Sequence, residues 1–327
     1  MLRRLALMAV SEGGAVTVST GAREQLRLRV APEDRGERLD RYVTAQAPHL
    51  SRSAVQRLIE EGAVLVNHAP GKASYRVEEG DVVEVQVPLP TPAEPKPEAI
   101  PLDIVYEDAA LVVLNKPAGL VVHPAHGHRT GTLLNALLAR YPELRAWPAE
   151  EGFPGLVHRL DRDTSGLLLV ARTPAVQQAL RRQFKARTVD KVYLALVHGS
   201  PRLDRARIDS PIGRDERERK RMAVVSEGGR EAVTEYEVLE RLPGYSLLEV
   251  HPKTGRTHQI RVHLAAIGHP VAGDPLYGPR RERLPLNRLF LVAARLSFIH
   301  PISGEEVTFS VPLPAELERL LAELRRT

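Results

Sequence analysis

Six prolines lie within residues 88–101, in the first third of the chain. Proline fixes φ and lacks an amide hydrogen, so such a stretch favours extended polyproline geometry over the interior of a helix or sheet. It predicts a semi-rigid linker over residues 89–101. With 327 residues, 43% of them hydrophobic, the chain can form two folded units. We expect a small domain over 25–88 and a large domain over 102–327, after a loose N-terminal tail over 1–24 that lacks a sustained pattern.

The small domain is predicted to combine strands with two short helices. Leu26–Val30 alternates as a strand, Ser51 or Ser53 can cap the second helix, and residues 64–67 and 81–87 are typical of strands. Two helices followed by a Gly-x-Val-x-Val-Asn strand resemble the RNA-binding domain named after ribosomal protein four of the small subunit. This resemblance implies a set of RNA-facing arginines: Arg35, Arg38, Arg41, Arg52 and Arg57. The alternative is that these arginines form a solvated helix face.

A polar turn lies between two apolar segments of the large domain, over residues 155–172. Its last part, 167–171, is an apolar run of the length of a buried strand. Asp161 lies between Arg159 and Arg162, where cationic neighbours favour an ionised carboxylate close to any phosphate that the arginines attract. This pattern indicates a nucleophile presented to a polyanion. Asp, Thr, Ser and Gly are also ordinary turn formers, so the residues alone leave a purely structural turn open.

The longer string His-Arg-Leu-Asp-x-x-Thr-Ser-Gly, residues 158–166, resembles the catalytic motif of the pseudouridine synthases of the RluA and RluD type. By this resemblance Asp161 is the catalytic nucleophile. A Lys-x-Tyr motif similar to the family's implies that Tyr193 lies against the target base, although a tyrosine anchored in the core would fit the same strand. The motif that contains Arg261 implies an active-site arginine paired with the catalytic carboxylate. The sequence Pro-Ile-Gly-Arg that ends at Arg214 looks like the RluD branch.

The resemblance also implies a fold and a reaction. The fold class is α+β: a mixed, largely antiparallel sheet flanked by helices, with a small N-terminal α/β RNA-binding domain. The reaction isomerises specific uridines of 23S ribosomal RNA to pseudouridine without a cofactor: the N-glycosidic bond breaks, the base rotates, and the sugar is rejoined through carbon five. Asp161 would attack or deprotonate the ribose, Arg261 would hold that carboxylate, and Tyr193 would take the proton from the new carbon linkage. Because a buried uridine must be extruded, four residues are expected to contact the flipped nucleotide and its phosphates: His158, Arg159, Arg214 and Arg221.

Histidines occur in two arrangements that bear on the site. Thr257 can cap a helix, which would place His258 and Arg261 three residues apart on one face. Another loop carries three histidines without a nearby carboxylate, so we expect no metal site there: His123, His126 and His128.

Composition restricts the partners. The net charge of +5 and a pI of about 9.5 favour an acidic partner such as nucleic acid, and only 4% aromatic residues favour arginine contacts over base stacking. The resemblance implies that this partner is large-subunit ribosomal RNA. Without cysteine, neither a disulfide nor a thiolate metal site can form. No apolar stretch reaches the roughly 18 residues of a membrane span, so we expect a cytoplasmic protein that binds no membrane. The reaction that the resemblance implies needs no small-molecule cofactor, and we expect a monomer. Two alternatives stay open: a non-catalytic RNA-binding ribosome-assembly protein, and a synthase acting on other ribosomal or transfer RNA uridines.

Overall fold

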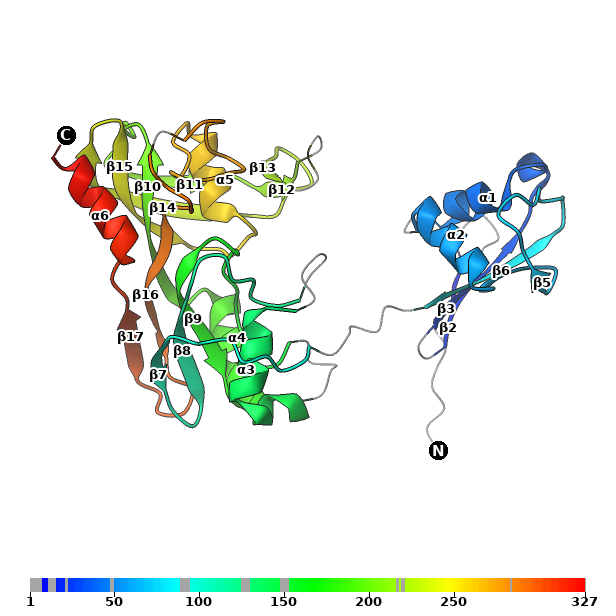
Figure 1. Cartoon of the computed structure of the whole chain (residues 1–327), viewed down its shortest axis with the longest axis horizontal. Helices are drawn as coiled ribbons and strands as arrows, with labels where there is room; N and C mark the ends of the chain where they lie inside the picture. The colour runs from blue at the N-terminus through cyan, green and yellow to red at the C-terminus, as the bar shows by residue number, and fades with distance from the viewer. Residues whose placement is uncertain are drawn as a thin grey trace. The chain divides into compact units, whose positions relative to one another are not determined.

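The computed structural model describes most of the chain, in the following ranges: 8–10, 16–20, 23–47, 50–88, 95–124, 130–147, 153–215, 218, 221–282 and 284–326. The chain separates into two compact units, Met1–Ala93 and Glu94–Thr327 (Figure 1). Each unit has its own sheet and its own hydrophobic core.

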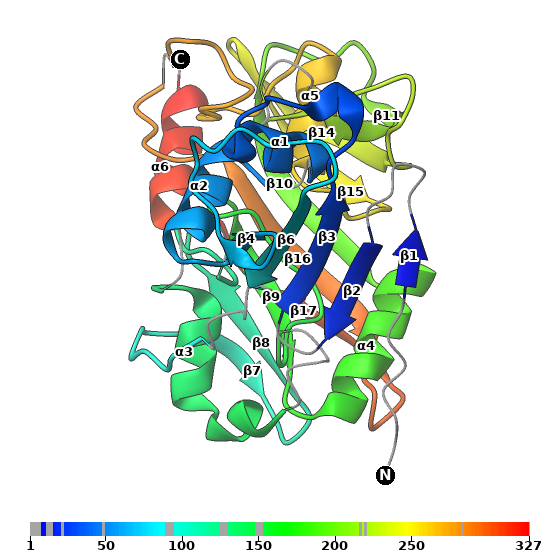
Figure 2. The same ribbon diagram turned by 90° about the vertical axis from the view of Figure 1, so that its right-hand side faces the viewer.

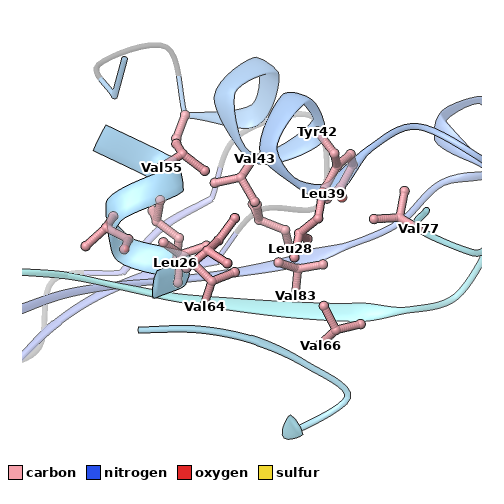
Figure 3. Packing of buried hydrophobic residues seen from close by; sticks show 14 of the residues in the cluster. Leu26, Leu28, Leu39, Tyr42, Val43, Val55, Val64, Val66, Val77 and Val83 are labelled. Atoms are coloured by element: carbon pink, nitrogen blue, oxygen red, sulfur yellow. The ribbon is translucent and has the colours of Figure 1, made fainter. Parts of the chain in front are cut away.

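The N-terminal unit consists of a six-stranded antiparallel sheet and short helices. Its elements are β1 (Met8–Val10), β2 (Val16–Thr20), β3 (Arg23–Arg29), η1 (Pro32–Asp34), α1 (Leu39–Gln46), α2 (Arg52–Glu60), β4 (Val64–Val66), β5 (Ala69–Pro70) and β6 (Val82–Pro88). The strands lie in the order β1-β2-β3-β6-β4-β5. Helices α1 and α2 cover one face of this sheet (Figure 3).

Alternation along β3 builds the core of this unit. Leu26 and Leu28 are buried and pair with Val85 and Val83 of β6, while the alternate residues Arg27 and Arg29 are exposed. Figure 3 shows this apolar face beneath the buried side chains of α1 and α2. Ser51 is the cap of α2, because its hydroxyl oxygen accepts the N–H of Ala54 at 3.3 Å.

The prediction of a loose tail over residues 1–24 is wrong where the structure describes that segment. Strands β1 and β2 lie there and pair antiparallel with each other, and β2 pairs with β3. Four of the five residues of Val16–Thr20 are β-branched, a composition that suits a strand once β3 provides an open edge.

The predicted linker also differs from the structure in its second half. The described part, residues 95–101, has no regular secondary structure, but it is bound to the N-terminal end of α3 (Leu133–Arg140). The Asn135 side chain donates to the carbonyl of Lys96 at 2.7 Å, and the Glu98 N–H donates to the carbonyl of Asn135 at 3.0 Å. These contacts make residues 96–98 part of the C-terminal unit.

The C-terminal unit is built on a nine-stranded sheet. Its elements are β7 (Ile104–Glu107), β8 (Leu111–Lys116), α3, η2 (Pro142–Ala146), β9 (Ser165–Ala171), α4 (Pro174–Ala186), β10 (Asp190–His198), β11 (Arg205–Asp209), β12 (Ile212–Arg214), β13 (Met222–Val224), β14 (Val233–Leu242), β15 (Tyr245–Pro252), α5 (Gln259–Ala266), β16 (Leu291–Ile299), β17 (Glu306–Ser310) and α6 (Ala315–Leu324). The order is β11-β14-β15-β10-β16-β9-β8-β7, with β17 also paired to β16, and β12 and β13 form a separate hairpin. Among the described strand pairings of this sheet, that of β16 with β9 is parallel and the others are antiparallel. This confirms the predicted α+β fold with a mixed, largely antiparallel sheet.

Helices cover both faces of this sheet. Leu168 and Val170 of β9 pack with α3, and the alternate residues Leu167 and Leu169 pack with α4. Figure 2 shows α3 and α4 on either side of strands β8 and β9. Burial on both faces explains why residues 167–171 form a continuous apolar run instead of an alternating one.

Gly166 fixes the position of the polar turn before β9. Ala293 of β16 pairs with Gly166 on one side and with Tyr193 of β10 on the other. Gly166 has φ +113°, and a Cβ atom there would lie 2.3 Å from the carbonyl oxygen of Ala293, so only glycine fits. Tyr193 therefore lies two strand spacings from the start of β9, about 10 Å.

Candidate active site

A cavity of about 480 Å³ lies in the C-terminal unit beside the turn that precedes β9. Asp161 of that turn, Tyr193 of β10 and Arg261 of α5 all line it. The Asp161 side chain keeps 17% of its exposure, so a molecule in the cavity can reach the carboxylate. The three residues predicted to be catalytic, up to a hundred positions apart in the sequence, thus share one cavity.

Asp274 binds Arg261 more closely than Asp161 does. Its carboxylate accepts Nε of Arg261 at 2.7 Å and Nη2 at 2.8 Å, whereas Nη1 lies 3.4 Å from Oδ2 of Asp161. Asp274 also accepts the N–H groups of Leu276 and Tyr277. The side chains of Asp274 and Arg261 keep 0% and 3% of their exposure. The expected pairing of Arg261 with Asp161 therefore needs a correction: two guanidinium donors are committed to Asp274, and one reaches Asp161.

This ion pair fixes a positive charge beside Asp161. Burial acts to raise the pKa of Asp274, but the hydrogen bonds and charge of Arg261 outweigh burial and hold that pKa below its usual value. Burial acts to lower the pKa of Arg261, but Asp274 and Asp161 keep it raised. Both groups are therefore charged at neutral pH.

His258 and Tyr277 form a second chain of contacts that ends at Asp161. Helix α5 does not begin with a Thr257 cap: His258 is the N-cap, in the left-handed conformation with φ 56°. This conformation is costly for a residue with a Cβ atom, and here it accompanies a side chain that lines the cavity. His258 Nδ1 lies 2.9 Å from the Tyr277 hydroxyl, which accepts the N–H of Met222 at 2.9 Å. His258 Nε2 lies 3.9 Å from Oδ2 of Asp161.

These contacts favour one tautomer of His258. The Tyr277 hydroxyl, which accepts the N–H of Met222, can donate its own hydrogen to Nδ1 of His258. In that arrangement Nε2 carries the ring hydrogen and directs it toward Asp161. The other tautomer would direct a lone pair at the carboxylate. Burial lowers the pKa of His258, the charge of Asp161 opposes this, and the charge of Arg261 reinforces it. A neutral imidazole with an Nε2–H donor thus faces the cavity.

Tyr193 packs between the two hydrophobic clusters that flank the cavity. Burial, with the negative charge of Asp161, raises the pKa of its phenol well above the usual value. The phenol therefore keeps its hydrogen at neutral pH. It can donate a hydrogen bond, but it is poorly suited to the expected role of proton acceptor.

Lys116 holds the turn that contains Asp161 in place, a role that the sequence did not suggest. Its buried ammonium group donates to the carbonyls of Pro117, Leu120 and Arg162, at 2.7, 2.9 and 3.0 Å. The N–H of Gly119 donates to the same Arg162 carbonyl at 2.8 Å. Burial lowers the pKa of Lys116 to about 7. One side chain thus connects the turn after β8 to the residue that follows Asp161.

His158 and Arg159 differ in what they offer to RNA. His158 Nε2 accepts the N–H of Leu169 at 2.9 Å, and its ring stacks on Phe184 with centroids 4.7 Å apart. Burial, reinforced by the charge of Lys191, lowers the pKa of His158 to about 3. A neutral ring committed to the backbone of β9 is not the phosphate-binding cation that we expected. Arg159 is exposed and lines the cavity.

The two arginines expected at the β12–β13 hairpin are also in different settings. Arg214 is exposed at the end of β12. The Arg221 guanidinium lies 5.2 Å from the centre of the Tyr277 ring, and the Arg261 guanidinium lies 5.1 Å from the same ring centre. Arg221 thus contacts the residue that binds His258.

The five arginines of the N-terminal unit do not form one set. Arg38 and Arg52 donate to the buried carboxylate of Asp40, at 3.0 and 2.8 Å. Burial acts to raise the pKa of Asp40, but hydrogen bonds from Arg38, Arg52 and Gln56 hold it far below its usual value. These two arginines therefore stabilise the fold of α1 and α2. The others are exposed with no described ion pair: Arg35, Arg41 and Arg57.

Among the described residues, no cluster of three or more His, Asp or Glu side chains could hold a metal ion. His126 and His128 lie outside the described residues. None of the helices that the structure describes is both long enough and apolar enough to cross a bilayer.

Comparisons with known proteins agree with both units. Residues 110–266 match the RNA pseudouridylate synthase family, and residues 37–83 match the S4 domain. The chain is 53% identical to an uncharacterized RNA pseudouridine synthase of Chloroflexus aurantiacus, over 90% of this chain and 92% of that protein. It is 45% identical to the ribosomal large subunit pseudouridine synthase D of Neisseria meningitidis serogroup A, over 92% of this chain and 82% of that protein. The structure resembles human RNA pseudouridylate synthase domain containing 1, with a TM-score of 0.53 and 32% identity over 70% of this chain and 97% of that one.

Proposed function

The chain belongs to the RNA pseudouridine synthases, and we propose that it isomerises specific uridines of large-subunit ribosomal RNA to pseudouridine, with Asp161 as the nucleophile and without a cofactor. The observation that carries this proposal is the cavity that Asp161 shares with Arg261 and Tyr193. The relatives named ribosomal large subunit pseudouridine synthase D support the choice of RNA. We expect the enzyme to act as a monomer in the cytoplasm.

Breaking a uridine N-glycosidic bond requires a nucleophile at the ribose and donors for the charge that builds up on the uracil. Asp161 meets the first need because Arg261, itself locked by Asp274, keeps a cation 3.4 Å away and favours the ionised carboxylate. Two donors face the same cavity for the second need: the Nε2–H of His258 and the phenol of Tyr193. After the sugar is rejoined to carbon five, the hydrogen of that carbon leaves as a proton, and N1, which has lost its bond to the sugar, gains a proton. The net reaction therefore moves one proton from carbon five to N1 and needs no redox partner.

The N-terminal unit has the chemistry of a phosphate-binding surface. Three arginines are exposed and lack a described carboxylate partner, so they can bind phosphates of an RNA backbone: Arg35, Arg41 and Arg57. Because such contacts are electrostatic, this unit would add affinity without reading sequence.

The test uses an unmodified transcript of large-subunit ribosomal RNA that carries tritium on carbon five of its uridines. The wild-type protein should release tritium in proportion to pseudouridine formed, and Asp161→Asn, which keeps size and removes charge, should release none while binding the transcript within a few-fold of wild type. Full release by Asp161→Asn contradicts the nucleophile assignment. Release from transfer RNA but not from the ribosomal transcript contradicts the proposed substrate.

A further inference from the structure

Lys191 is a cation in the catalytic cavity that the reaction steps above do not use. It precedes Tyr193 by two residues on β10, and because side chains alternate along a strand, both face the cavity that Asp161 lines. The two positions are about 7 Å apart along the strand. Within the described part of the chain, the Lys191 ammonium group forms no hydrogen bond and no ion pair.

The groups around Lys191 do not neutralise it. Burial lowers its pKa to about 8, the charge of Asp190 opposes this, and the charges of Lys253 and Arg187 reinforce it. On the side of the catalytic turn, the group that faces it is the neutral ring of His158, whose own pKa Lys191 lowers. An ammonium group in this setting lacks the anion that would compensate its burial.

The neighbouring cations have partners of their own. Nη2 of Arg187 lies 2.7 Å from the carboxylate of Glu231, and Nζ of Lys253 lies 3.0 Å from the carboxylate of Glu235. Of these three cations, Lys191 is therefore the one without a described carboxylate partner. It is also less exposed than Arg187 and Lys253.

We propose that Lys191 binds a backbone phosphate of the RNA, next to the uridine whose base lies against Tyr193. The proposal rests on the proposed function, since it assumes that the uridine enters this cavity. The spacing fits, because a ribose separates a uracil ring from the phosphates of its own nucleotide. The burial of the ammonium group is already part of the folded state, so an arriving phosphate gains a charge-assisted hydrogen bond without a further desolvation cost on the lysine.

Three variants test this site. Lys191→Met removes the charge at similar length, and Lys191→Arg keeps the charge but does not titrate below pH 12. The control is Lys185→Met, which removes the same charge from an exposed lysine at the rim of the cavity. The dissociation constant of the unmodified large-subunit transcript is measured against salt at pH 7, and against pH from 7 to 9 at fixed salt.

A phosphate held by Lys191 predicts a specific pH dependence. The lysine binds the phosphate when protonated, so the affinity of the wild type should fall as the pH rises above about 8, by up to tenfold per unit. Lys185→Met should keep this decline, and Lys191→Arg should bind well at pH 7 without it. Lys191→Met should bind more weakly, show a flat profile, and lose about 0.7 to 0.9 from the slope of log affinity against log salt.

The outcomes separate this site from the proposed function. If Lys191→Met keeps the wild-type slope and pH profile while the wild type releases tritium, the phosphate site is wrong and the proposed function stands. If the wild type releases no tritium, the proposed function fails, and the binding profiles still decide whether Lys191 holds a phosphate. Should Lys191→Met fail to fold, Lys191→Arg decides alone: a decline above pH 8 as in the wild type overturns the proposal.

Discussion

Removing the Arg261 side chain should destabilise the C-terminal unit as well as inactivate it. In Arg261→Ala the carboxylate of Asp274, with 0% exposure, would keep two backbone N–H donors and lose both guanidinium donors and the opposite charge. Breaking a buried ion pair by removing one partner costs about 3 to 5 kcal/mol, because an uncompensated charge stays behind. For a unit of this size, each kcal/mol lowers the unfolding midpoint by about 2 to 4 °C, so the expected loss is roughly 6 to 20 °C.

Urea and thermal unfolding measure this cost, with Arg205→Ala as the control. Arg205 pairs with Glu237 at 2.6 Å, but its side chain keeps 76% of its exposure, so its loss should leave the free energy of unfolding nearly unchanged. Arg261→Lys should lie between the two, because lysine keeps the charge but cannot donate two parallel hydrogen bonds to Asp274 while reaching Asp161. We expect partial loss of stability and severely reduced tritium release from the labelled transcript. Equal unfolding midpoints for Arg261→Ala and Arg205→Ala would refute the energetic argument, and normal turnover by Arg261→Lys would refute the argument from geometry.

Three further predictions follow from the contacts. Lys116→Met leaves three carbonyls without their donor, which costs about 1 to 3 kcal/mol for each carbonyl that stays buried. The variant should have a lower unfolding midpoint and a lower rate of tritium release, with unchanged RNA affinity. A normal rate would show that the turn keeps its conformation without Lys116. The free energy of unfolding should fall as the pH drops below 6.5, because His158 of the unfolded chain takes up a proton there while the folded ring, with a pKa of about 3, does not. The slope from this group approaches about 1.4 kcal/mol per pH unit. If urea titrations between pH 4 and 7 show that the stability of His158→Gln declines as steeply as that of the wild type, His158 is not the cause. The isolated unit of residues 1–93 should fold and bind RNA with an affinity that falls steeply with salt. The slope of log affinity against log salt concentration should be about −0.9 per phosphate contact. Salt-independent binding in a filter assay would rule out an arginine–phosphate interface.

Local pattern and turn chemistry were sufficient for much of the fold. The alternation at Leu26 and Leu28 gave a strand with the correct buried face, and Ser51, one of the two predicted candidates, caps α2. These features depend on residues within a few positions of one another, so a single sequence contains what is needed to infer them. One exception is β2, whose pairing depends on an edge of β3 that only the folded sheet provides. Another is the start of α5, where His258 and not the predicted Thr257 is the N-cap.

The candidate site shows the opposite dependence. Asp161 was evident from its motif, but its surroundings come from segments distant in the sequence: Lys116 meets Arg162 across 46 positions, and Asp274 rather than Asp161 takes the two strongest donors of Arg261. The sequence indicated which side chains are candidates for the chemistry, because charge and residue type are local properties. Only packing decided which carboxylate pairs with Arg261. A buried charge without a partner is costly, so the arginine pairs with the nearest well-aligned carboxylate in space, wherever that residue lies in the chain.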